Sequence, residues 1–271
     1  MQRAEINGAT IEYDVQGSGE PVLLIHGAIF ADGFPPLIAE PALRGYQFIV
    51  IHRRGYAGSS GAEAIVGVSQ HAADCRELLR HLRIERAHIA GHSYGGDVAL
   101  QLALDAPGVV HSLVLLEPGL LAVPSGQQFA EQVGPAAELW AAGKKAESAD
   151  AFLRVVCGEN YRTAVDNFLP AGMAQAAEGI DPTFQSDLPG LQDWAFTQEL
   201  ATRITQPVLT VLGAESAPIF PEGNALLREW LPQAENFILP GAGHLLQIQN
   251  PRGMAEALAG FLARHPLPVA A

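Results

Sequence analysis

The sequence has little cysteine and little positive charge. Only two of its 271 residues are cysteines, Cys75 and Cys157. Two thiols in a chain of this length do not make a disulfide framework, so we expect both to be free and packed as small apolar groups. There are 16 Lys and Arg against 29 Asp and Glu, which gives a net charge of −13. Because an acidic surface repels phosphate backbones, the composition argues against a nucleic-acid partner.

Long apolar runs and cofactor motifs are also missing. No run approaches the roughly 18 apolar residues that span a bilayer, and residues 1–5 lead into a strand-like stretch where a signal peptide would have an apolar core. We therefore expect a cytoplasmic protein, a monomer or homodimer, with no membrane partner. Gly17-Ser18-Gly19 is too short for a phosphate loop. His88 and His92 lack an evident third ligand, so neither a metal nor another cofactor is expected.

The first 117 residues alternate between strand-like and helix-like patterns. Continuous apolar runs, typical of parallel strands covered on both faces, occur at 22–25, 48–51, 87–90 and 113–116. Helical spacing of apolar residues occurs at 70–82 and 94–104, and residues 6–15 read as a β-hairpin that turns at Asn7-Gly8. Strands that alternate with helices indicate an α/β fold with a mostly parallel sheet.

The strand pattern stops after Glu117. Residues 118–203 are rich in Ala and Gln, punctuated by proline, and contain no convincing apolar strand. Strand-like runs return at 208–212 and 236–239, and a helix is predicted from 251 to 264. We therefore expect an α/β core formed by residues 1–117 and 204–271, with a helical insertion over 118–203.

Residues 91–95 fit the pattern G-x-S-x-G, with Ser93 at its centre. The apolar run 87–90 precedes the motif and the helical pattern from Tyr94 follows it. A sharp strand-to-helix turn in this context holds a serine hydroxyl above the sheet, and glycines leave room for that turn because they lack a Cβ. The motif predicts Ser93 as a nucleophile. The alternative is an ordinary serine in a turn.

A serine nucleophile needs a base, and His244 is the histidine best placed to be one. It follows the last predicted strand, in Gly241-Ala242-Gly243-His244. Parallel strands deliver their loops to one edge of the sheet, so this loop is expected to reach Ser93. His265 ends the last predicted helix, and His71 and His81 fall on a helix expected to lie at the surface.

Acyl transfer also requires N–H donors arranged around the developing oxyanion. One candidate is the amide of Tyr94, which directly follows the nucleophile. The other is the amide of Ala28, in the loop His26-Gly27-Ala28 after the apolar run 22–25. We interpret His26 as a hydrogen-bonded support of this loop.

Four motifs, in order, resemble the landmarks of the α/β-hydrolase superfamily, and the likeness covers nearly the whole chain. The resemblance implies an α/β-hydrolase fold, with a mostly parallel eight-stranded sheet flanked by helices and a helical lid over residues 118–203. The motifs are His26-Gly27, Arg54-Gly55-Tyr56-Ala57-Gly58-Ser59, Gly91-His92-Ser93-Tyr94-Gly95-Gly96 and Gly241-Ala242-Gly243-His244.

The sequence departs from the family pattern at the acid that orients the base. The common pattern places Asp in the loop after the strand at 208–212, where this sequence has Ser216, with Glu215 one position earlier. Some haloalkane dehalogenases and a fungal lactonase of this fold carry the acid after the strand that follows the nucleophile helix. Glu117 occupies that position here. A carboxylate that ends a buried strand needs a partner such as an imidazole N–H, so we predict Glu117 as the acid and Glu215 as the second choice.

A second departure follows the strand at 48–51, where the family often has Asp and this sequence reads His52-Arg53-Arg54. Three potential cations would favour an anionic substrate, but a solvated loop with one structural arginine is the interpretation we prefer. Aromatic residues of the insertion either line a substrate pocket or form the insertion's own core. The pocket residues we predict are Ile29, Phe30, Phe34, Trp140 and Trp194.

The sequence therefore predicts a serine hydrolase that acts on a small molecule, a moderately hydrophobic carboxylic ester or lactone, through an acyl-enzyme on Ser93. Three alternatives stay open. They are a C–C bond hydrolase, a cofactor-free perhydrolase or oxygenase on the same scaffold, and a non-catalytic small-molecule receptor. The fold alone does not choose among them, because it hosts many chemistries.

Overall fold

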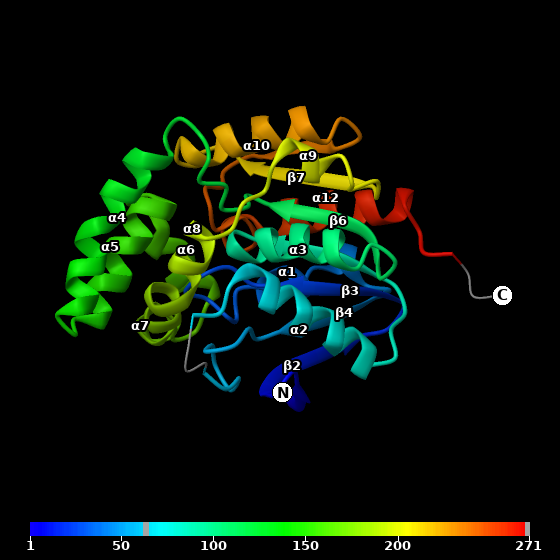
Figure 1. Cartoon of the computed structure of the whole chain (residues 1–271), viewed down its shortest axis with the longest axis horizontal. Coiled ribbons are helices and arrows are strands. Elements are labelled where there is room, and N and C mark those ends of the chain that lie inside the picture. The colour runs from blue at the N-terminus through cyan, green and yellow to red at the C-terminus, as the bar shows by residue number, and fades with distance from the viewer. Residues whose placement is uncertain (62–64, 269–271) are drawn as a thin grey trace.

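The computed structural model of the chain describes residues 1–61 and 65–268. Its centre is an eight-stranded sheet in the order β1-β2-β4-β3-β5-β6-β7-β8 (Figure 1). The strands β1 and β2 form an antiparallel hairpin, β2 also runs antiparallel to β4, and all other pairs are parallel. The mostly parallel sheet and the hairpin are as predicted. The strands are β1 (Gln2–Ile6), β2 (Ala9–Gly17), β3 (Glu20–Ile25), β4 (Tyr46–Ile51), β5 (Ala87–His92), β6 (Val110–Leu116), β7 (Val208–Gly213) and β8 (Glu235–Leu239).

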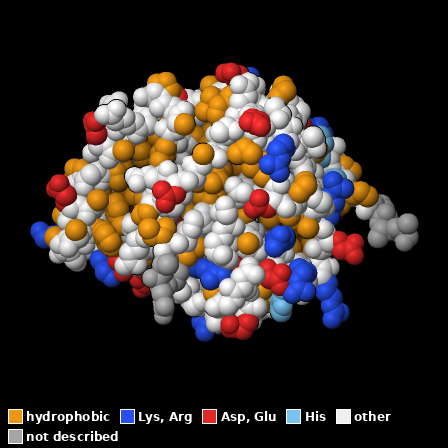
Figure 2. Space-filling view, viewed as in Figure 1, with side chains coloured by type: hydrophobic (Ala, Val, Ile, Leu, Met, Phe, Trp, Pro, Cys, Tyr) orange, Lys and Arg blue, Asp and Glu red, His pale blue; other side chains and the backbone are white. Residues whose placement is uncertain are grey.

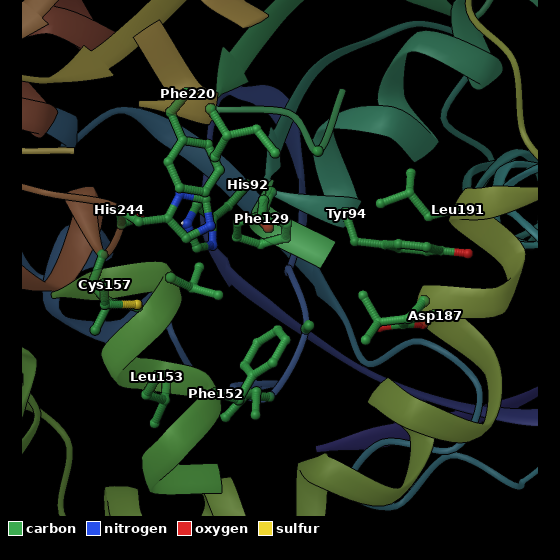
Figure 3. Close-up of a pocket in the computed structure, with 18 of the residues that line it drawn as sticks. His92, Tyr94, Phe129, Phe152, Leu153, Cys157, Asp187, Leu191, Phe220 and His244 are labelled. Carbon is green, nitrogen blue, oxygen red and sulfur yellow. Dashed lines mark hydrogen bonds between the residues drawn. The ribbon is translucent and has the colours of Figure 1, made fainter. Parts of the chain in front are cut away.

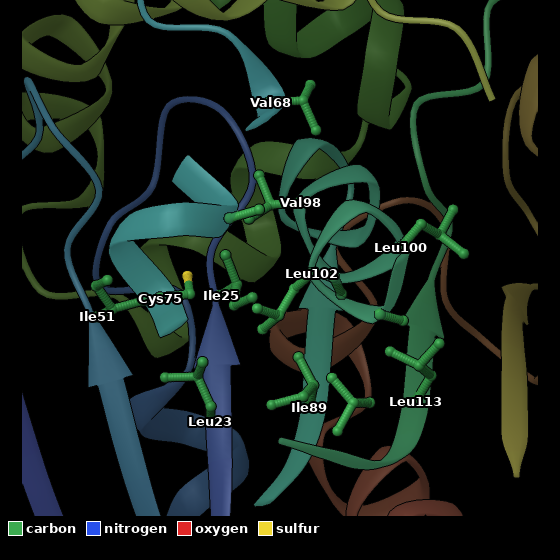
Figure 4. Close-up of a cluster of buried hydrophobic side chains, with 14 of the residues drawn as sticks. Leu23, Ile25, Ile51, Val68, Cys75, Ile89, Val98, Leu100, Leu102 and Leu113 are labelled. Atoms are coloured by element: carbon green, nitrogen blue, oxygen red, sulfur yellow. The ribbon is translucent and has the colours of Figure 1, made fainter. Parts of the chain in front are cut away.

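Helices cover both faces of the sheet, which explains why its strands are continuous apolar runs. One face packs against α2, α3 and α10, and its core contains Ile89 and Val98 together with the free thiol of Cys75 (Figure 4). The other face packs against α1, α11 and α12, around Leu24 and Leu258. These helices are α1 (Pro35–Ile38), α2 (Val68–His81), α3 (Tyr94–Asp105), α10 (Ile219–Trp230), α11 (Leu246–Gln249) and α12 (Pro251–Arg264), with a short 3-10 turn at Pro41–Leu43.

The chain between β6 and β7 folds into helices that we call the helical insertion. Figure 1 shows α4 to α8 gathered at the end of the sheet to which β6 and β7 point. Its core includes Phe152, Val165 and Ile180, and also takes in Ile29 and Phe30 from the loop after β3. The helices are α4 (Gly126–Ala141), α5 (Lys145–Cys157), α6 (Tyr161–Phe168), α7 (Gly172–Pro182), the π-helical turn η2 (Thr183–Asp187), α8 (Leu188–Gln192) and α9 (Gln198–Ala201).

The surface of the helical insertion carries exposed apolar side chains, which Figure 2 shows at the left of the view. A surface groove runs there between α4 and the η2–α8 segment, lined by Phe129, Val133, Phe184 and Leu188 among others. Among the described residues, no helix combines the length and apolarity needed to cross a membrane.

Candidate active site

Ser93 lies at the sharp turn between β5 and α3. Its backbone is in a strained region, with φ of 52° and ψ of −127°, a geometry that is rare for a residue with a side chain and persists where the surroundings enforce it. The flanking glycines make the turn possible. A Cβ on Gly91 would lie 2.1 Å from the carbonyl oxygen of Gly95, and a Cβ on Gly95 would lie 2.1 Å from that of Ile25. The motif therefore holds Ser93 at the carboxyl edge of the sheet, as the sequence predicts.

The loop after β3 lies directly against this turn. A Cβ on Gly27 would lie 2.8 Å from the Cβ of Ser93, so only glycine permits the approach. The next residue, Ala28, lines the same cavity as Ser93 and Tyr94. Tyr94 is the first residue of α3, where an amide N–H has no helical carbonyl to bond. The structure thus brings the two predicted oxyanion donors to the edge of one cavity beside Ser93.

His244 and Glu117 form a buried pair, with 2.7 Å between His244 Nδ1 and Glu117 Oε2. Glu117 directly follows β6 and has a positive φ of 48°. Its other oxygen, Oε1, accepts hydrogen bonds from the Gly213 amide at 2.7 Å and the Ser216 hydroxyl at 2.5 Å. Glu215, the second choice for the acid, is exposed, and the described residues show no hydrogen bond from its carboxylate to His244. The geometry therefore pairs the imidazole with Glu117.

Burial controls the protonation of this pair. Loss of solvent lowers the pKa of His244 to about 3, which keeps its imidazole neutral and able to accept a proton. Burial also raises the pKa of Glu117 to about 7, while the hydrogen bonds from Ser216 and Gly213 act in the opposite direction and favour the carboxylate. These two bonds therefore help to keep Glu117 charged beside the imidazole.

Two aromatic rings enclose the imidazole of His244 (Figure 3). Phe220 of α10 stacks on it, with 3.9 Å between ring centroids and 13° between planes. His92 lies 4.7 Å away in a tilted arrangement. His92 Nε2 donates to the His244 carbonyl at 2.7 Å, and the Gln247 side-chain amide donates to His92 Nδ1 at 3.2 Å. Burial lowers the pKa of His92 to about 3, so this neutral ring supports the loop that carries His244.

Sequence reasoning gave no role to His92 or Phe220. Their signals were weak, because His92 is a variable position of the motif and Phe220 directly precedes Pro221, which obscures the helical pattern. Ser93 and His244 line the same cavity, but the described residues show no hydrogen bond between the Ser93 hydroxyl and the His244 ring. Such bonds are often long before a substrate binds.

The cavity above Ser93 is lined mostly by apolar side chains. Ile29 and Phe30 line it, as predicted, and Ala28 lies beside them. Sequence reasoning missed the side chains that the helical insertion and α10 contribute, because the helical spacing does not show which face of each helix points to the cavity. These residues include Phe129, Phe152, Leu153, Val156, Cys157, Asp187, Leu188, Leu191, Ile219 and Phe220.

Three predicted pocket residues are wrong. Phe34 is fully buried in the core between the sheet and the helices α1 and α12. Trp140 stacks on Phe184 inside the insertion. Trp194 stacks on Phe196 and lines a groove on the outer surface. These aromatic side chains pack against their own neighbours and do not line the cavity.

The loop His52-Arg53-Arg54 contains a structural arginine, as interpreted from the sequence, but the loop is buried where a solvated one was expected. Arg53 is fully buried and forms a two-pronged ion pair with Asp187, with both N–O distances 2.7 Å. Arg54 pairs with Asp74, and His52 lies between Glu12 and Asp32. Acidic side chains therefore take up all three potential cations. His71 is also buried, next to Arg53, and not at the surface.

Among the described residues, no group of three or more His, Cys, Asp or Glu side chains could hold a metal ion. Asp187 is the one acidic residue that lines the cavity in the described part of the chain, and its oxygens already bind Arg53 and the Tyr56 hydroxyl. The chemistry that this arrangement offers is a strained serine hydroxyl, a neutral imidazole backed by a carboxylate, and two backbone amides.

Comparisons with known proteins agree with this architecture. A sequence model of the α/β hydrolase fold matches residues 20–251. A 2-(acetamidomethylene)succinate hydrolase from Mesorhizobium japonicum is 26% identical over 278 residues, which cover 96% of this chain and 94% of that protein. An esterase structure from Thermogutta terrifontis has a TM-score of 0.82 at 22% identity, covering 98% of this chain and 100% of the esterase.

An enol-lactonase structure from Burkholderia xenovorans LB400 has a TM-score of 0.83 at 18% identity, covering 97% of this chain and 100% of the lactonase. Likenesses at this identity concern the fold. The sheet order, the strained turn at Ser93 and the match over most of the sequence lead to the same conclusion. The chain belongs to the α/β-hydrolase fold family.

Proposed function

We propose that the protein is a serine hydrolase that cleaves an uncharged, moderately hydrophobic carboxylic ester or lactone through an acyl-enzyme on Ser93. One observation carries the proposal. The buried Glu117–His244 pair opens onto the cavity that also holds Ser93 and the residues of the two candidate oxyanion donors. A nucleophile, a base oriented by a third group and a nearby pair of N–H donors make up the Ser-His-acid template.

In this mechanism, His244 Nε2 accepts the proton of the Ser93 hydroxyl as Oγ attacks the carbonyl carbon. The carbonyl electron pair moves to the oxygen, which the amides of Ala28 and Tyr94 bind. Glu117 accepts the Nδ1–H bond and stabilises the imidazolium. When the tetrahedral intermediate collapses, the leaving alkoxide takes the proton from His244, and the acyl group stays on Ser93.

Water then completes the reaction by the same route. His244 accepts a proton from water as the hydroxide attacks the acyl carbon, and the second intermediate releases the acid and returns the proton to Ser93 Oγ. With a lactone, the leaving alkoxide remains part of the same product molecule. No cofactor takes part in these steps.

The cavity walls indicate an uncharged substrate. No Lys or Arg among the described residues lines the cavity, and Asp187 is already paired. A carboxylate buried there would lack a cation, which costs several kcal/mol. The Mesorhizobium relative is named for a succinate derivative, so we infer that this protein takes a different substrate class. We further propose that the helical insertion acts as a lid, because its side chains close the cavity over Ser93.

Intact-mass spectrometry after treatment with a fluorophosphonate tests the proposal. The wild type should gain the mass of one adduct, and Ser93→Ala should gain none. Hydrolysis of 4-nitrophenyl acyl esters and of simple lactones, lost in the same variant, would then fix the reaction type. A folded wild type that forms no adduct would exclude an activated serine and favour a small-molecule receptor. Labelling together with turnover of a vinylogous diketone, but not of esters, would favour a C–C bond hydrolase.

A further inference from the structure

The mechanism leaves the side chain of Arg53 without a role, although it is the largest fully buried side chain near the cavity. Its guanidinium donates at both ends. Toward the helical insertion it binds Asp187. Toward the loop after β3, Nε donates to the His26 carbonyl at 3.1 Å and Nη2 donates to the Gly27 carbonyl at 2.9 Å. Arg53 therefore bridges the helical insertion and the loop that lies against Ser93.

The carbonyl of Gly27 belongs to the same peptide group as the amide N–H of Ala28. Because a peptide group is planar, fixing the oxygen also fixes the direction of the N–H. A second donor holds the same oxygen, since His26 Nδ1 lies 2.7 Å from it. His26 Nε2 accepts the main-chain N–H of Arg53 at 3.0 Å, which leaves the proton of the neutral ring on Nδ1. Two donors, one of them charged, thus converge on the oxygen of this peptide.

We propose that Arg53 is a positioning residue for the oxyanion hole, which fixes and polarises the Gly27–Ala28 peptide so that the Ala28 amide binds the oxyanion more strongly. A positive donor on a carbonyl withdraws electron density from the peptide, and hydrogen bonds in a chain strengthen one another at low dielectric. The inference rests on the proposed function, because it assigns Ala28 to the oxyanion hole.

The guanidinium also contacts the residue that carries the second donor. It lies over the ring of Tyr94, 4.5 Å from the centroid, and over that of Tyr56 at 4.7 Å. Contacts of a cation with an aromatic face at this distance are attractive. Arg53 therefore touches the Gly27–Ala28 peptide on one side and the Tyr94 side chain on the other, and it fixes their spacing.

Asp187 connects this arrangement to the helical insertion. It ends η2, a π-helical turn, and π-helical turns often occur at functional sites. Its Oδ2 also accepts the Tyr56 hydroxyl at 2.6 Å. In the same turn, Thr183 Oγ1 accepts the Ile29 amide at 3.3 Å. The η2 turn is thus hydrogen-bonded to the loop after β3, so the position of the Gly27–Ala28 peptide depends on the position of the helical insertion.

The test removes the bridge without leaving a buried charge unpaired. Arg53→Met alone would strand Asp187, which would destabilise the fold, so the variant is Arg53→Met/Asp187→Asn. The matched control is Arg54→Met/Asp74→Asn. It removes the neighbouring ion pair, whose hydrogen bonds within the described residues do not reach the loop after β3. Circular dichroism and thermal unfolding establish that both variants are folded.

Loss of one oxyanion donor costs about 10²- to 10³-fold in kcat, and weakening one donor should cost about 10- to 100-fold. We expect this loss in Arg53→Met/Asp187→Asn, with KM within about threefold. The affinity for a trifluoromethyl ketone, which forms a tetrahedral oxyanion on a serine, should fall by the same factor. The control should change neither quantity. A folded variant that keeps kcat and inhibitor affinity within about threefold of the wild type would overturn the proposal.

An NMR measurement separates this proposal from the proposed function. Glycine labelled at the carbonyl carbon and alanine labelled at the amide nitrogen isolate the signals of Gly–Ala pairs, and Ala28→Ser identifies the Ala28 signal by its loss. The Ala28 proton should move upfield in Arg53→Met/Asp187→Asn and stay in place in the control. If the wild type forms no fluorophosphonate adduct, the proposed function fails, yet this signal still decides whether Arg53 polarises the peptide. An Ala28 proton with the same chemical shift in Arg53→Met/Asp187→Asn as in the wild type would refute the role of Arg53.

Should the double variant not fold, Arg53→Lys takes its place in both measurements. Lysine keeps the charge opposite Asp187 but lacks the planar fork that reaches Asp187 and Gly27 together. The same directions of change are expected, and their absence counts equally against the proposal.

Discussion

The Ser216 hydroxyl donates a hydrogen bond of 2.5 Å to Oε1 of Glu117. Ser216 lies in the loop after β7, where the family resemblance places the acid, and Glu117 lies at the end of β6, the strand paired with β7. The carboxylate is therefore contributed by the neighbouring strand, and the residue at the usual position supports it. With Oε1 held by Ser216 and the Gly213 amide, Oε2 is left for His244.

Glu117→Gln should lower kcat by about 10³- to 10⁴-fold, since an amide in place of the acid favours the wrong imidazole tautomer. Glu215→Gln is the matched control, because Glu215 is exposed and lies in the adjacent loop; its kcat should stay within about twofold of the wild type. Steady-state hydrolysis of a 4-nitrophenyl ester measures both. The reverse order of effects would assign the acid to Glu215.

Ser216→Asp should have opposite effects in two backgrounds. In the wild type it places a second carboxylate against Glu117, and like charges at this distance disfavour ionisation, so activity should fall. In Glu117→Gln it supplies a carboxylate from the loop after β7 and should recover at least about tenfold of the lost kcat. Ser216→Ala in each background controls for loss of the hydroxyl. No recovery in the double variant would show that the loop after β7 cannot orient His244.

The positions of the strands could be predicted from the sequence because they follow from local apolar patterns. The proximity of the site residues could be predicted because it follows from the geometry of a parallel sheet. Apolar runs located all six strands that follow the hairpin, and the last helix has the bounds that its spacing predicts. Helix α10 was missed, since Pro221 and Gly223 interrupt its first turns. Parallel strands place their loops at one edge, which is why Ser93, Glu117 and His244 meet.

The residues that form the walls of the cavity were much harder to predict from the sequence. Residue type does not say which face of a helix points inward, so among the insertion's aromatic residues Trp140 and Trp194 were wrongly chosen in place of Phe129 and Phe152. The partners of the loop His52-Arg53-Arg54 were hidden for another reason. The sequence predicted one structural arginine there but not which one, because Asp187, the partner of Arg53, is 134 residues away in the sequence.

Because no Lys or Arg among the described residues lines the cavity, we can predict which substrates it excludes. Two 4-nitrophenyl esters with acyl groups of similar length, the pentanoate and the hemisuccinate, differ mainly in a terminal carboxylate. We expect kcat/KM at least about 100-fold lower for the hemisuccinate, because its charge would be buried without a cation. Comparable values for the two esters would show that the acyl terminus reaches solvent or that a cation enters the site.

Several buried histidines should make the free energy of unfolding depend on pH. Burial lowers the pKa of His26 and His71 well below the usual value and that of His92 and His244 to about 3. As the pH falls below about 6.5, these histidines bind protons in the unfolded chain but stay neutral in the folded protein. Their contribution to stability is full above that pH and is lost toward about pH 3. Asp97, whose pKa burial raises, acts in the opposite direction because its folded form takes up a proton first.

His71→Gln isolates one of these contributions outside the proposed catalytic groups. Glutamine keeps an acceptor for Arg53, which donates to His71 Nε2 at 3.3 Å, but does not titrate. Urea unfolding at pH 7.5 and pH 5.5 gives the loss of stability on acidification for each protein. That loss should be smaller in His71→Gln by about 1.4 kcal/mol, the value for one histidine that stays neutral one pH unit below its unfolded pKa. Any offset between the proteins at pH 7.5 cancels in this comparison. An equal loss in both would mean that His71 takes up its proton in the folded state, despite its burial beside Arg53.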